Sequence, residues 1–170
     1  MGTGERNQGT IRLAVRDDLR QIVAIYNASI PGRLATADTE PVTVDQRREW
    51  FERHDPSTHP LFVVERDGRI VSWQSFERFY GRPAYRATAE LSLYVAHDCQ
   101  RQGLGRLMLV HAIERASDLQ LENLLAFIFG HNEPSLRLFR SHGFGDWGHL
   151  PAVARLDGTP RDLMILGRTV

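Results

Sequence analysis

Two glycines separated by one residue lie in a short polar segment that follows a strand-like pattern and precedes a helix-like one. Glycine lets the backbone approach a ligand closely, and the first N–H groups of a helix have no partner within the helix. Those donors, together with the positive end of the helix dipole, suit a phosphate group. Two arginines add positive charge. The residues of this glycine loop are Gln100, Arg101, Gln102, Gly103, Leu104, Gly105 and Arg106.

The spacing in the glycine loop does not match the common nucleotide-binding motifs. No Gly-Lys-Ser or Gly-Lys-Thr ending follows, which excludes a P-loop, and Met108 stands where a dinucleotide-binding fingerprint needs its third glycine. Because short glycine patterns often occur without a ligand, a plain tight turn that opens a helix is an equally good interpretation of the loop alone.

A candidate general base lies in the strand-like segment before the loop. Between residues 85 and 95, apolar and polar residues alternate, which predicts a strand with one apolar face and one polar face. Glu90 is on the polar face with Ser92 and Tyr94, and such a face borders either solvent or a ligand cleft. Partial burial would raise the pKa of a carboxyl group there and make it a useful base. A structural carboxylate bound to Arg86 or to a neighbouring strand is the alternative.

The periodicity along the chain predicts the elements that must position these residues. Strands are expected at residues 10–15, 61–65, 69–79, 85–95 and 124–129, with two more after Phe144. Helices are expected after Asp17 or Asp18 as cap, after a capping box of Thr43 and Gln46, at residues 104–117 and after Asn132. Asp67-Gly68 is a two-residue hairpin signal. The sequence therefore predicts one mixed α/β domain, of the α+β type, over residues 10–170, preceded by a flexible polar tail at residues 1–9.

Composition excludes several classes of protein. The 170 residues include 21 basic and 21 acidic side chains, so the formal net charge is zero and gives no overall attraction to a nucleic acid. No run approaches the roughly 20 apolar residues of a membrane span. Cys99 is the one cysteine, so no disulfide within the chain is expected, and a reducing, cytoplasmic setting is the default interpretation. The seven histidines lack metal-ligand spacing, and no metal site is expected.

Several motifs, taken in order, resemble one enzyme superfamily. Gln100-x-x-Gly103-x-Gly105, after a strand that ends Leu93-Tyr94-Val95, resembles the acyl-coenzyme A signature of the GNAT acetyltransferase superfamily. Further segments resemble its branch of phosphinothricin and methionine sulfoximine acetyltransferases: Ile25-Tyr26-Asn27, Thr39-Glu40-Pro41-Val42, Trp73-Gln74-Ser75-Phe76, the strand at 85–95, Asn132-x-x-Ser135 and Gly143-Phe144. The resemblance covers residues 10–168.

The resemblance implies a fold and an activity. The fold is a central mixed, twisted sheet of six or seven strands with four helices, whose fourth and fifth strands splay apart into a V-shaped cleft. The activity is transfer of the acetyl group of acetyl-coenzyme A (acetyl-CoA) to the primary amine of a small molecule. The expected acceptor is an amino acid or an analogue of the phosphinothricin, methionine sulfoximine or methionine sulfone type. The expected assembly is a homodimer with Trp147 near its interface.

The resemblance also assigns roles to residues. Glu90 is the expected base, and the backbone N–H of Val95 is expected to meet the oxyanion. The glycine loop, residues 100–106, would hold the pyrophosphate. Residues expected along the pantetheine arm are Leu93, Tyr94 and Val95 through their backbone, and Asn132 and Ser135 from the other side. Residues that could line the acceptor pocket are Tyr26, Thr36, Arg82 and Tyr85.

Two positions depart from the pattern of the branch. Phe139 stands where the superfamily often has a tyrosine and this branch a histidine, so no side-chain acid is expected there. The leaving thiolate is then protonated by water or leaves without a proton donor. Tyr80 stands where the branch often has an arginine, so the usual clamp for an α-carboxylate is missing. A non-catalytic acyl-CoA-binding module therefore stays open as the alternative, which release of thiol with a panel of amines would exclude.

Overall fold

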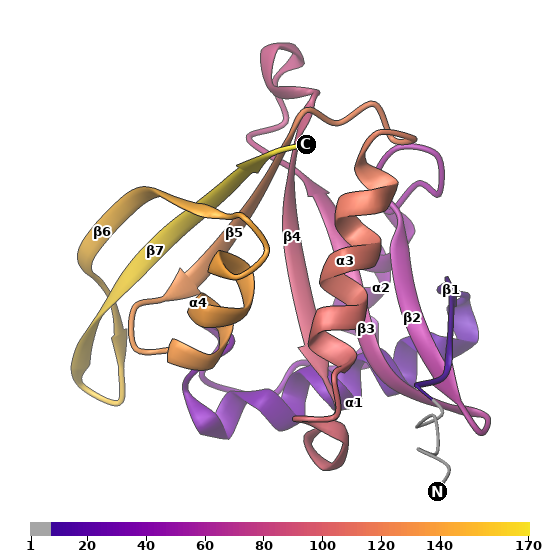
Figure 1. Cartoon of the computed structure of the whole chain (residues 1–170). Helices are drawn as coiled ribbons and strands as arrows, with labels where there is room; N and C mark the ends of the chain where they lie inside the picture. Colours follow the sequence, from indigo (N-terminus) through magenta and orange to yellow (C-terminus); the bar gives the residue numbers. More distant parts are fainter. Residues whose placement is uncertain (1–7) are drawn as a thin grey trace, which may run out of the picture.

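The computed structural model describes residues 8–170, and most of the expected tail, residues 1–7, lies outside the described residues. The strands are β1 (Thr10–Leu13), β2 (Leu61–Arg66), β3 (Arg69–Arg78), β4 (Thr88–Val95), β5 (Asn123–Phe129), β6 (Gly145–Leu156) and β7 (Thr159–Thr169). The α-helices are α1 (Leu19–Ser29), α2 (Val44–Glu52), α3 (Leu104–Ala116) and α4 (Glu133–Arg140). The described residues thus form the mixed α/β architecture that the sequence predicts (Figure 1).

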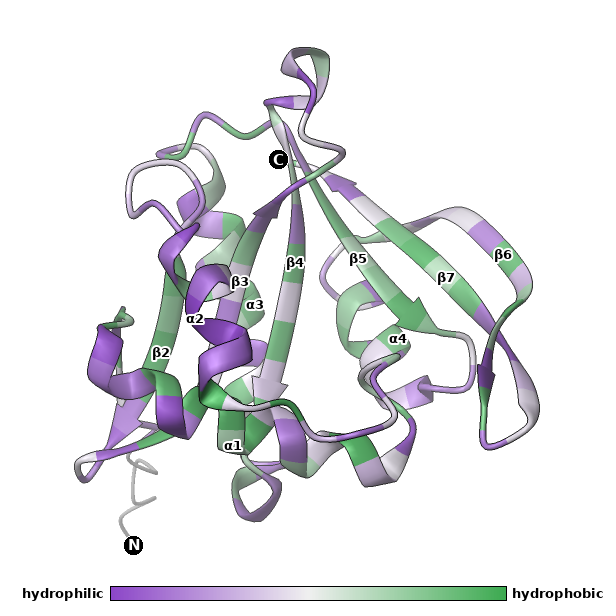
Figure 2. Ribbon diagram, turned by 180° about the vertical axis from the view of Figure 1, so that it is seen from behind, coloured by the Kyte–Doolittle hydropathy of each residue, from purple (hydrophilic) through white to green (hydrophobic). Residues whose placement is uncertain are grey.

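The strands join one sheet in the order β1-β2-β3-β4-β5-β7-β6. Neighbouring strands are antiparallel except β4 and β5, which are parallel. Asp67 and Gly68 both have positive φ angles, as a type I′ turn requires, and join β2 to β3 as predicted. Figures 1 and 2 show β4 and β5 diverging toward the carboxyl end of β4. The expected splay between the fourth and fifth strands is therefore present.

Helices cover both faces of the sheet. In Figure 1, α3 and α4 lie in front of the sheet, and in Figure 2, seen from behind, α1 and α2 do. The core fills the space between these layers, where Ile22 of α1, Phe76 of β3 and Met108 of α3 are at most 1% exposed. Burial of such apolar side chains supplies the main driving force for folding, and it fixes the sheet that carries the site.

Local sequence signals set the ends of two helices. The Thr43 hydroxyl accepts a hydrogen bond from the Gln46 N–H at 3.2 Å, and the Gln46 amide oxygen accepts one from the Thr43 N–H at 2.7 Å. This reciprocal pair confirms the capping box of α2. At the start of α4, Asn132 Oδ1 accepts from the Ser135 N–H at 3.3 Å, which confirms the predicted cap. Gly143, with a φ of 82°, follows the end of that helix.

The predicted start of the fourth strand is wrong. β4 begins at Thr88, and residues Pro83–Tyr85 form a 3₁₀ turn instead of strand. Proline holds φ near the helical value and lacks an N–H for a sheet ladder, so it favours a turn before the strand can begin. Tyr85 consequently lies outside the sheet, and it is 43% exposed.

Asp18 is the N-cap residue of α1, as predicted, but its side chain does not act as the cap. The Asp18 carboxylate makes no hydrogen bond to the first turn of α1. It accepts a hydrogen bond from the Val15 N–H at 2.8 Å and forms an ion pair with Arg12 Nη1 at 2.7 Å. A nearly buried carboxylate needs such a partner, and the guanidinium supplies it. Gly9, the last residue of the expected tail, lies close to β2, since a Cβ at Gly9 would lie 2.5 Å from the carbonyl oxygen of Glu65.

Candidate active site

Glu90 lies where the two central strands part. β4 and β5 pair over only three positions, Thr88 with Asn123, Ala89 with Leu124 and Glu90 with Leu125. β5 then continues to pair with β7 as far as Phe129, while the rest of β4 keeps only its partner β3. The sheet therefore opens directly after Glu90, and this residue occupies the apex of the V.

The backbone of β4 beyond Glu90 has hydrogen-bonding groups directed into the opening. The Ala87 carbonyl accepts hydrogen bonds from the N–H groups of Glu122 and Asn123, so odd-numbered residues of β4 direct their polar groups toward β5. Because these directions alternate along a strand, Leu93 and Val95 face the open side. An extended amide chain could add to this free edge as a further strand would.

The backbone of Tyr94 faces the other way. Its carbonyl is directed to β3 and accepts a hydrogen bond from the Ser72 hydroxyl at 2.8 Å. The expectation that all three residues at 93–95 offer backbone groups to a pantetheine arm is therefore corrected for Tyr94. The physical reason is the alternation itself, since neighbouring residues of a strand cannot both bond toward the same side.

The environment of Glu90 changes its acidity. Burial, and then the nearby charge of Glu77, raise the pKa of Glu90 from 4.5 to about 7. Within residues 8–170, the Glu90 carboxylate has no hydrogen bond and no ion pair, so the alternative of a structural carboxylate bound to Arg86 is absent there. A carboxylate with a pKa near neutrality can both take up and release a proton at physiological pH.

The glycine loop opens α3 with unpartnered donors. Gly103 caps the helix with a φ of 91°, which favours glycine, and the first helical bond runs from the Leu107 N–H to the Gly103 carbonyl at 2.9 Å. The N–H groups of residues 104–106 therefore have no partner inside the helix. Arg101 and Arg106 are exposed beside them. This geometry fits the predicted anion-binding helix start.

Side chains tether the glycine loop to the rest of the fold. Gln102 Nε2 donates to the Asp98 carbonyl at 3.1 Å, and Arg66 Nη1 donates to Gln102 Oε1 at 3.0 Å. Gln102 therefore holds the loop through its side chain, while Gln100 is exposed. A Cβ at Gly105 would lie 3.2 Å from Leu138 Cδ2, so this second glycine allows α3 to pack closely against α4.

The start of α4 meets the segment that follows α1. Asn132, besides capping its own helix, donates from Nδ2 to the Leu34 carbonyl at 3.0 Å, and His131 Nε2 lies 2.7 Å from the Arg33 carbonyl. The predicted contacts of Asn132 and Ser135 with a pantetheine arm stay predictions. Phe139 is 4% exposed and packs against Phe144 with the ring centroids 5.0 Å apart, so its position offers no proton donor.

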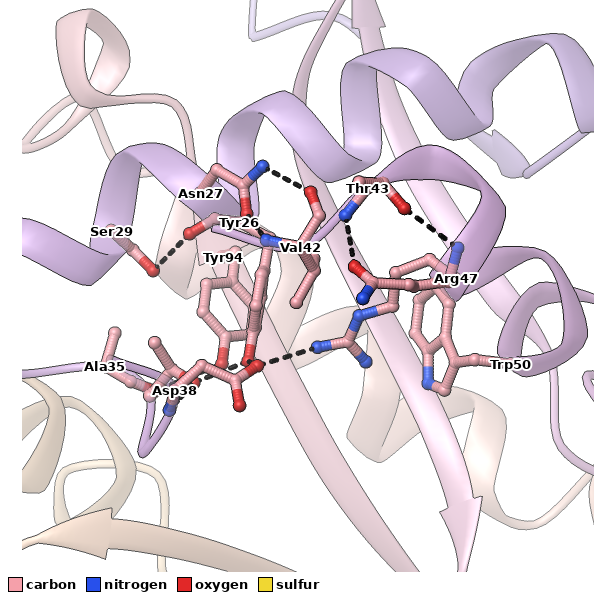
Figure 3. Close-up of polar contacts among 12 residues, drawn as sticks. Tyr26, Asn27, Ser29, Ala35, Asp38, Val42, Thr43, Arg47, Trp50 and Tyr94 are labelled. Carbon is pink, nitrogen blue, oxygen red and sulfur yellow. Dashed lines mark hydrogen bonds and ion pairs between the residues drawn. The ribbon is translucent and has the colours of Figure 1, made fainter. Parts of the chain in front are cut away.

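A polar cluster joins α1, α2 and the segment between them (Figure 3). The Tyr26 hydroxyl lies 2.5 Å from Thr36 Oγ1 and donates to Asp38 Oδ2 at 2.5 Å. The Arg47 guanidinium lies 4.4 Å from the centre of the Tyr26 ring and 3.4 Å from Asp38 Oδ2. The structure thus brings together Tyr26 and Thr36, two of the four predicted acceptor-site residues.

Tyr94 completes the cluster from β4. Its ring lies 5.2 Å from that of Tyr26 and stacks on Trp73 at 4.5 Å, and its hydroxyl donates to the Ala35 carbonyl at 3.0 Å. Burial raises the pKa of Tyr94 well above its ordinary value. Asp38 and Arg47 could not be predicted from the sequence, because no motif or periodicity marks them and only the fold brings them to Tyr26.

The other two predicted acceptor-site residues lie elsewhere. Arg82 and Tyr85 belong to the exposed segment between β3 and β4, which Figures 1 and 2 both place at the end of the sheet away from α1. There the rings of Phe79, Tyr80 and Tyr85 pack together, with centroids 5.0 to 5.8 Å apart. The predicted acceptor set therefore splits into two groups on different parts of the fold.

Two further properties concern the described residues as a whole. Across residues 8–170, no three histidine, cysteine, aspartate or glutamate side chains gather closely enough to hold a metal ion. No helix in that part of the chain has the length and apolar character needed to cross a membrane.

Comparison with known proteins places this geometry in context. The model of the acetyltransferase (GNAT) family matches residues 19–144. YwnH of Bacillus subtilis is 52% identical over 94% of this chain and 98% of its own length. An L-methionine sulfoximine/L-methionine sulfone acetyltransferase of Salmonella typhimurium is 31% identical over 92% of each chain. The crystal structure of a phosphinothricin acetyltransferase from Sinorhizobium meliloti, in complex with acetyl-CoA, is 27% identical, covers 96% of this chain and 89% of that one, and superposes with a TM-score of 0.90.

Proposed function

Because this chain belongs to the acetyltransferase (GNAT) family and is an acetyl-CoA-dependent N-acetyltransferase, we propose that its acceptor is the primary amine of a small amino acid or a close analogue. Relatives named for methionine sulfoximine, methionine sulfone and phosphinothricin support this acceptor class. The observation that carries the chemical part of the proposal is Glu90, a half-buried carboxylate with a pKa raised to about 7 at the apex of the splay.

Glu90 removes the proton that the acceptor amine must lose. An aliphatic amine has a pKa of about 10, so near neutral pH it is mostly an ammonium ion without a free electron pair. The Glu90 carboxylate takes one proton, directly or through a water molecule. The amine nitrogen then bonds to the thioester carbonyl carbon, the carbon–sulfur bond breaks, and the sulfur departs with the bonding electron pair as a thiolate. The nitrogen now carries one proton more than the amide product, and it loses that proton to water or to the departing thiolate.

The remaining groups of the cleft stabilise this step. The Val95 N–H, on the open side of β4, meets the negative charge that develops on the carbonyl oxygen. The free edge at Leu93 and Val95 orients the amides of the pantetheine arm, and the N–H groups of residues 104–106 receive its pyrophosphate beside Arg101 and Arg106. A thiol has a pKa of about 8.5, so the thiolate can leave without a proton donor at Phe139.

The acceptor is bound on the face of the sheet that carries α1 and α2. Tyr26 and Thr36, held together with Asp38 and Arg47, lie on this side, and their hydrogen-bonding groups suit a small polar molecule. Arg82 and Tyr85 contribute only if the segment between β3 and β4 reaches the bound acceptor. Replacement of Arg82 by alanine tests this, since an unchanged KM for the acceptor removes Arg82 from the site.

The assay for the proposal is release of thiol from acetyl-CoA with a panel of amines. The panel contains methionine sulfoximine, methionine sulfone, phosphinothricin, ordinary amino acids and simple amines that lack a carboxylate. Rapid thiol release with the amino acid analogues supports the proposal. Release only with amines that lack a carboxylate contradicts the acceptor class. Binding of acetyl-CoA without thiol release for any amine of the panel also contradicts the acceptor class.

We further infer that the protein is a homodimer in a reducing compartment such as the cytoplasm. β6 is an edge strand of the sheet, and its side chains Trp147, Leu150 and Val153 are 40% to 57% exposed. A long edge strand with exposed apolar side chains is suited to pairing with a second copy. Light scattering at micromolar concentration tests the dimer, and a mass of 19.4 kDa, that of one chain, would reject it. The reducing compartment fits the single, buried Cys99.

A further inference from the structure

A second carboxylate faces Glu90 across the sheet. In the antiparallel register of β3 and β4, Glu77 is the direct partner of Glu90. Side chains at such paired positions have Cβ atoms about 4.5 to 5.5 Å apart, and like charges there destabilise the sheet. An unfavourable pair at the apex of the cleft calls for a functional explanation, because folding alone would favour a neutral residue at either position.

The two carboxylates have different surroundings. Glu77 Oε1 accepts a hydrogen bond from the Ser75 hydroxyl at 3.1 Å and one from the Trp50 indole N–H at 3.3 Å. An indole N–H can only donate, so it needs an acceptor, and Glu77 Oε1 supplies one in the partly buried space beside Trp50. Glu90 has no hydrogen bond or ion pair among the described residues. The pair is therefore asymmetric, because Glu77 accepts hydrogen bonds from two donors, whereas Glu90 is half-buried without one in residues 8–170 and has a raised pKa.

We propose that Glu77 is a positioning residue for acetyl transfer, which acts through Glu90 by increasing the affinity of that carboxylate for the proton of the acceptor amine. The inference rests on the proposed function, in which Glu90 is the base. Glu77 touches neither substrate in this role. Its fixed charge makes proton uptake by Glu90 more favourable, because protonation removes the repulsion between the two carboxylates.

The other groups packed around the pair do not cancel this effect. From β5, the residue paired with Glu90 is the apolar Leu125. Just after the end of α2, the His54 ring packs edge-on against Trp50 at 4.8 Å, and burial lowers the pKa of His54, so the neutral imidazole predominates. Within residues 8–170, Glu77 is the charged group that acts on the acidity of Glu90.

The test compares the titration of Glu90 in matched variants. Glu77→Gln removes the charge and keeps an oxygen that can accept from Trp50, whereas Glu77→Asp keeps the charge. Glu52→Gln removes an exposed carboxylate at the end of α2 and serves as the control. Two readouts are needed, the acid limb of the pH profile of kcat/KM and the ¹³C NMR titration of labelled glutamate carboxyl groups. The resonance of Glu90 is assigned by its loss in Glu90→Gln.

We expect the wild type to titrate near pH 7 in both readouts. Glu77→Gln should lower this midpoint by roughly 0.5 to 1 pH unit, less than the full rise because burial is its larger cause. Glu77→Asp should retain most of the rise in the pKa of Glu90, and Glu52→Gln should retain all of it. A midpoint in Glu77→Gln equal to that of the wild type would overturn the inference. If Glu77→Gln does not fold, Glu77→Met provides the same comparison.

The two readouts separate this inference from the proposed function. If Glu90→Gln keeps full turnover, Glu90 is not the base and the inference fails with it, even if NMR shows the coupling of the two carboxylates. If Glu90→Gln loses turnover but Glu77→Gln leaves both the pH profile and the resonance unchanged, the base stands and only the role of Glu77 is refuted.

Discussion

Replacement of Glu90 by glutamine is expected to stabilise the protein while it removes the proposed base. Burial, and secondarily the charge of Glu77, raise the pKa of Glu90 from 4.5 to about 7. A carboxyl group with a higher pKa in the folded chain than in the unfolded chain stabilises the fold when protonated. That stability is fully present below the unfolded pKa and is lost as the pH rises through the folded pKa. The charged Glu90 carboxylate therefore lowers the free energy of unfolding of the wild type near pH 8 but not at acid pH.

The size of this cost follows from the change in pKa. At about 1.4 kcal/mol for each pKa unit, the rise from 4.5 to about 7 is worth roughly 3 to 4 kcal/mol. Because Glu90 is only partly buried, solvent screening reduces this to roughly 1 to 2 kcal/mol. Glutamine has nearly the same shape without the charge. Glu90→Gln should therefore unfold roughly 2 to 8 °C above the wild type near pH 8, since 1 kcal/mol moves the Tm of a domain of this size by about 2 to 4 °C.

Urea unfolding followed by tryptophan fluorescence measures the difference at two pH values. We expect Glu90→Gln to be the more stable protein at about pH 8, with most of the advantage gone near about pH 4.5, where both proteins are neutral at this position. Glu52→Gln is the control and should show no such pH dependence. An equal difference at both pH values, or a less stable Glu90→Gln at about pH 8, would refute the assignment of a raised pKa to Glu90.

Three further changes test other parts of the structure. Gly103→Ala forces a non-glycine residue to a φ of 91°. We expect a loss of about 1 to 2 kcal/mol in stability and a several-fold higher KM for acetyl-CoA. An unchanged KM would contradict the proposed role of the glycine loop in binding phosphate. Asp18→Asn removes the ion pair with Arg12, so we expect roughly 2 to 3 kcal/mol of destabilisation in urea. Burial raises the pKa of Asp18, but the contacts with Arg12 and Val15 outweigh burial and lower it. The wild type should therefore lose this stability as the pH falls below about 4. A difference in unfolding free energy between wild type and Asp18→Asn that does not change with pH would contradict this. Thr43→Ala removes the cap of α2 and should cost about 1 kcal/mol, and a neutral result in thermal unfolding would count against the cap.

The sequence predicts those features of the fold that depend on neighbouring residues. The capping box of α2 and the turn at Asp67-Gly68 are confirmed because each follows from the conformational preferences of adjacent residues. The start of β4 was missed because alternation of apolar residues continues back to residue 85, and the turn at Pro83 overrides it. The role of Asp18 was missed because its partner Arg12 lies in another element.

The candidate site likewise contains some features that neighbouring residues predict and others that depend on tertiary contacts. The places of Glu90 and the glycine loop in the fold could be predicted from the sequence, since one lies on the polar face of a strand and the other at the start of a helix. The pairing of Glu90 with Glu77 depends on the register of β3 against β4, and the meeting of Arg47 with Tyr26 depends on how α2 packs against α1. Such tertiary contacts leave no local pattern in the sequence, so only the structure reveals them.

Turnover of Glu90→Gln at saturating acetyl-CoA, with the Kd for acetyl-CoA measured on the same sample, tests most directly whether the carboxylate at the apex of the splay takes the proton of the acceptor. We expect kcat to fall by about 10²-fold or more while the Kd stays at the wild-type value. A kcat close to that of the wild type, with acetyl-CoA bound as tightly, would contradict the account.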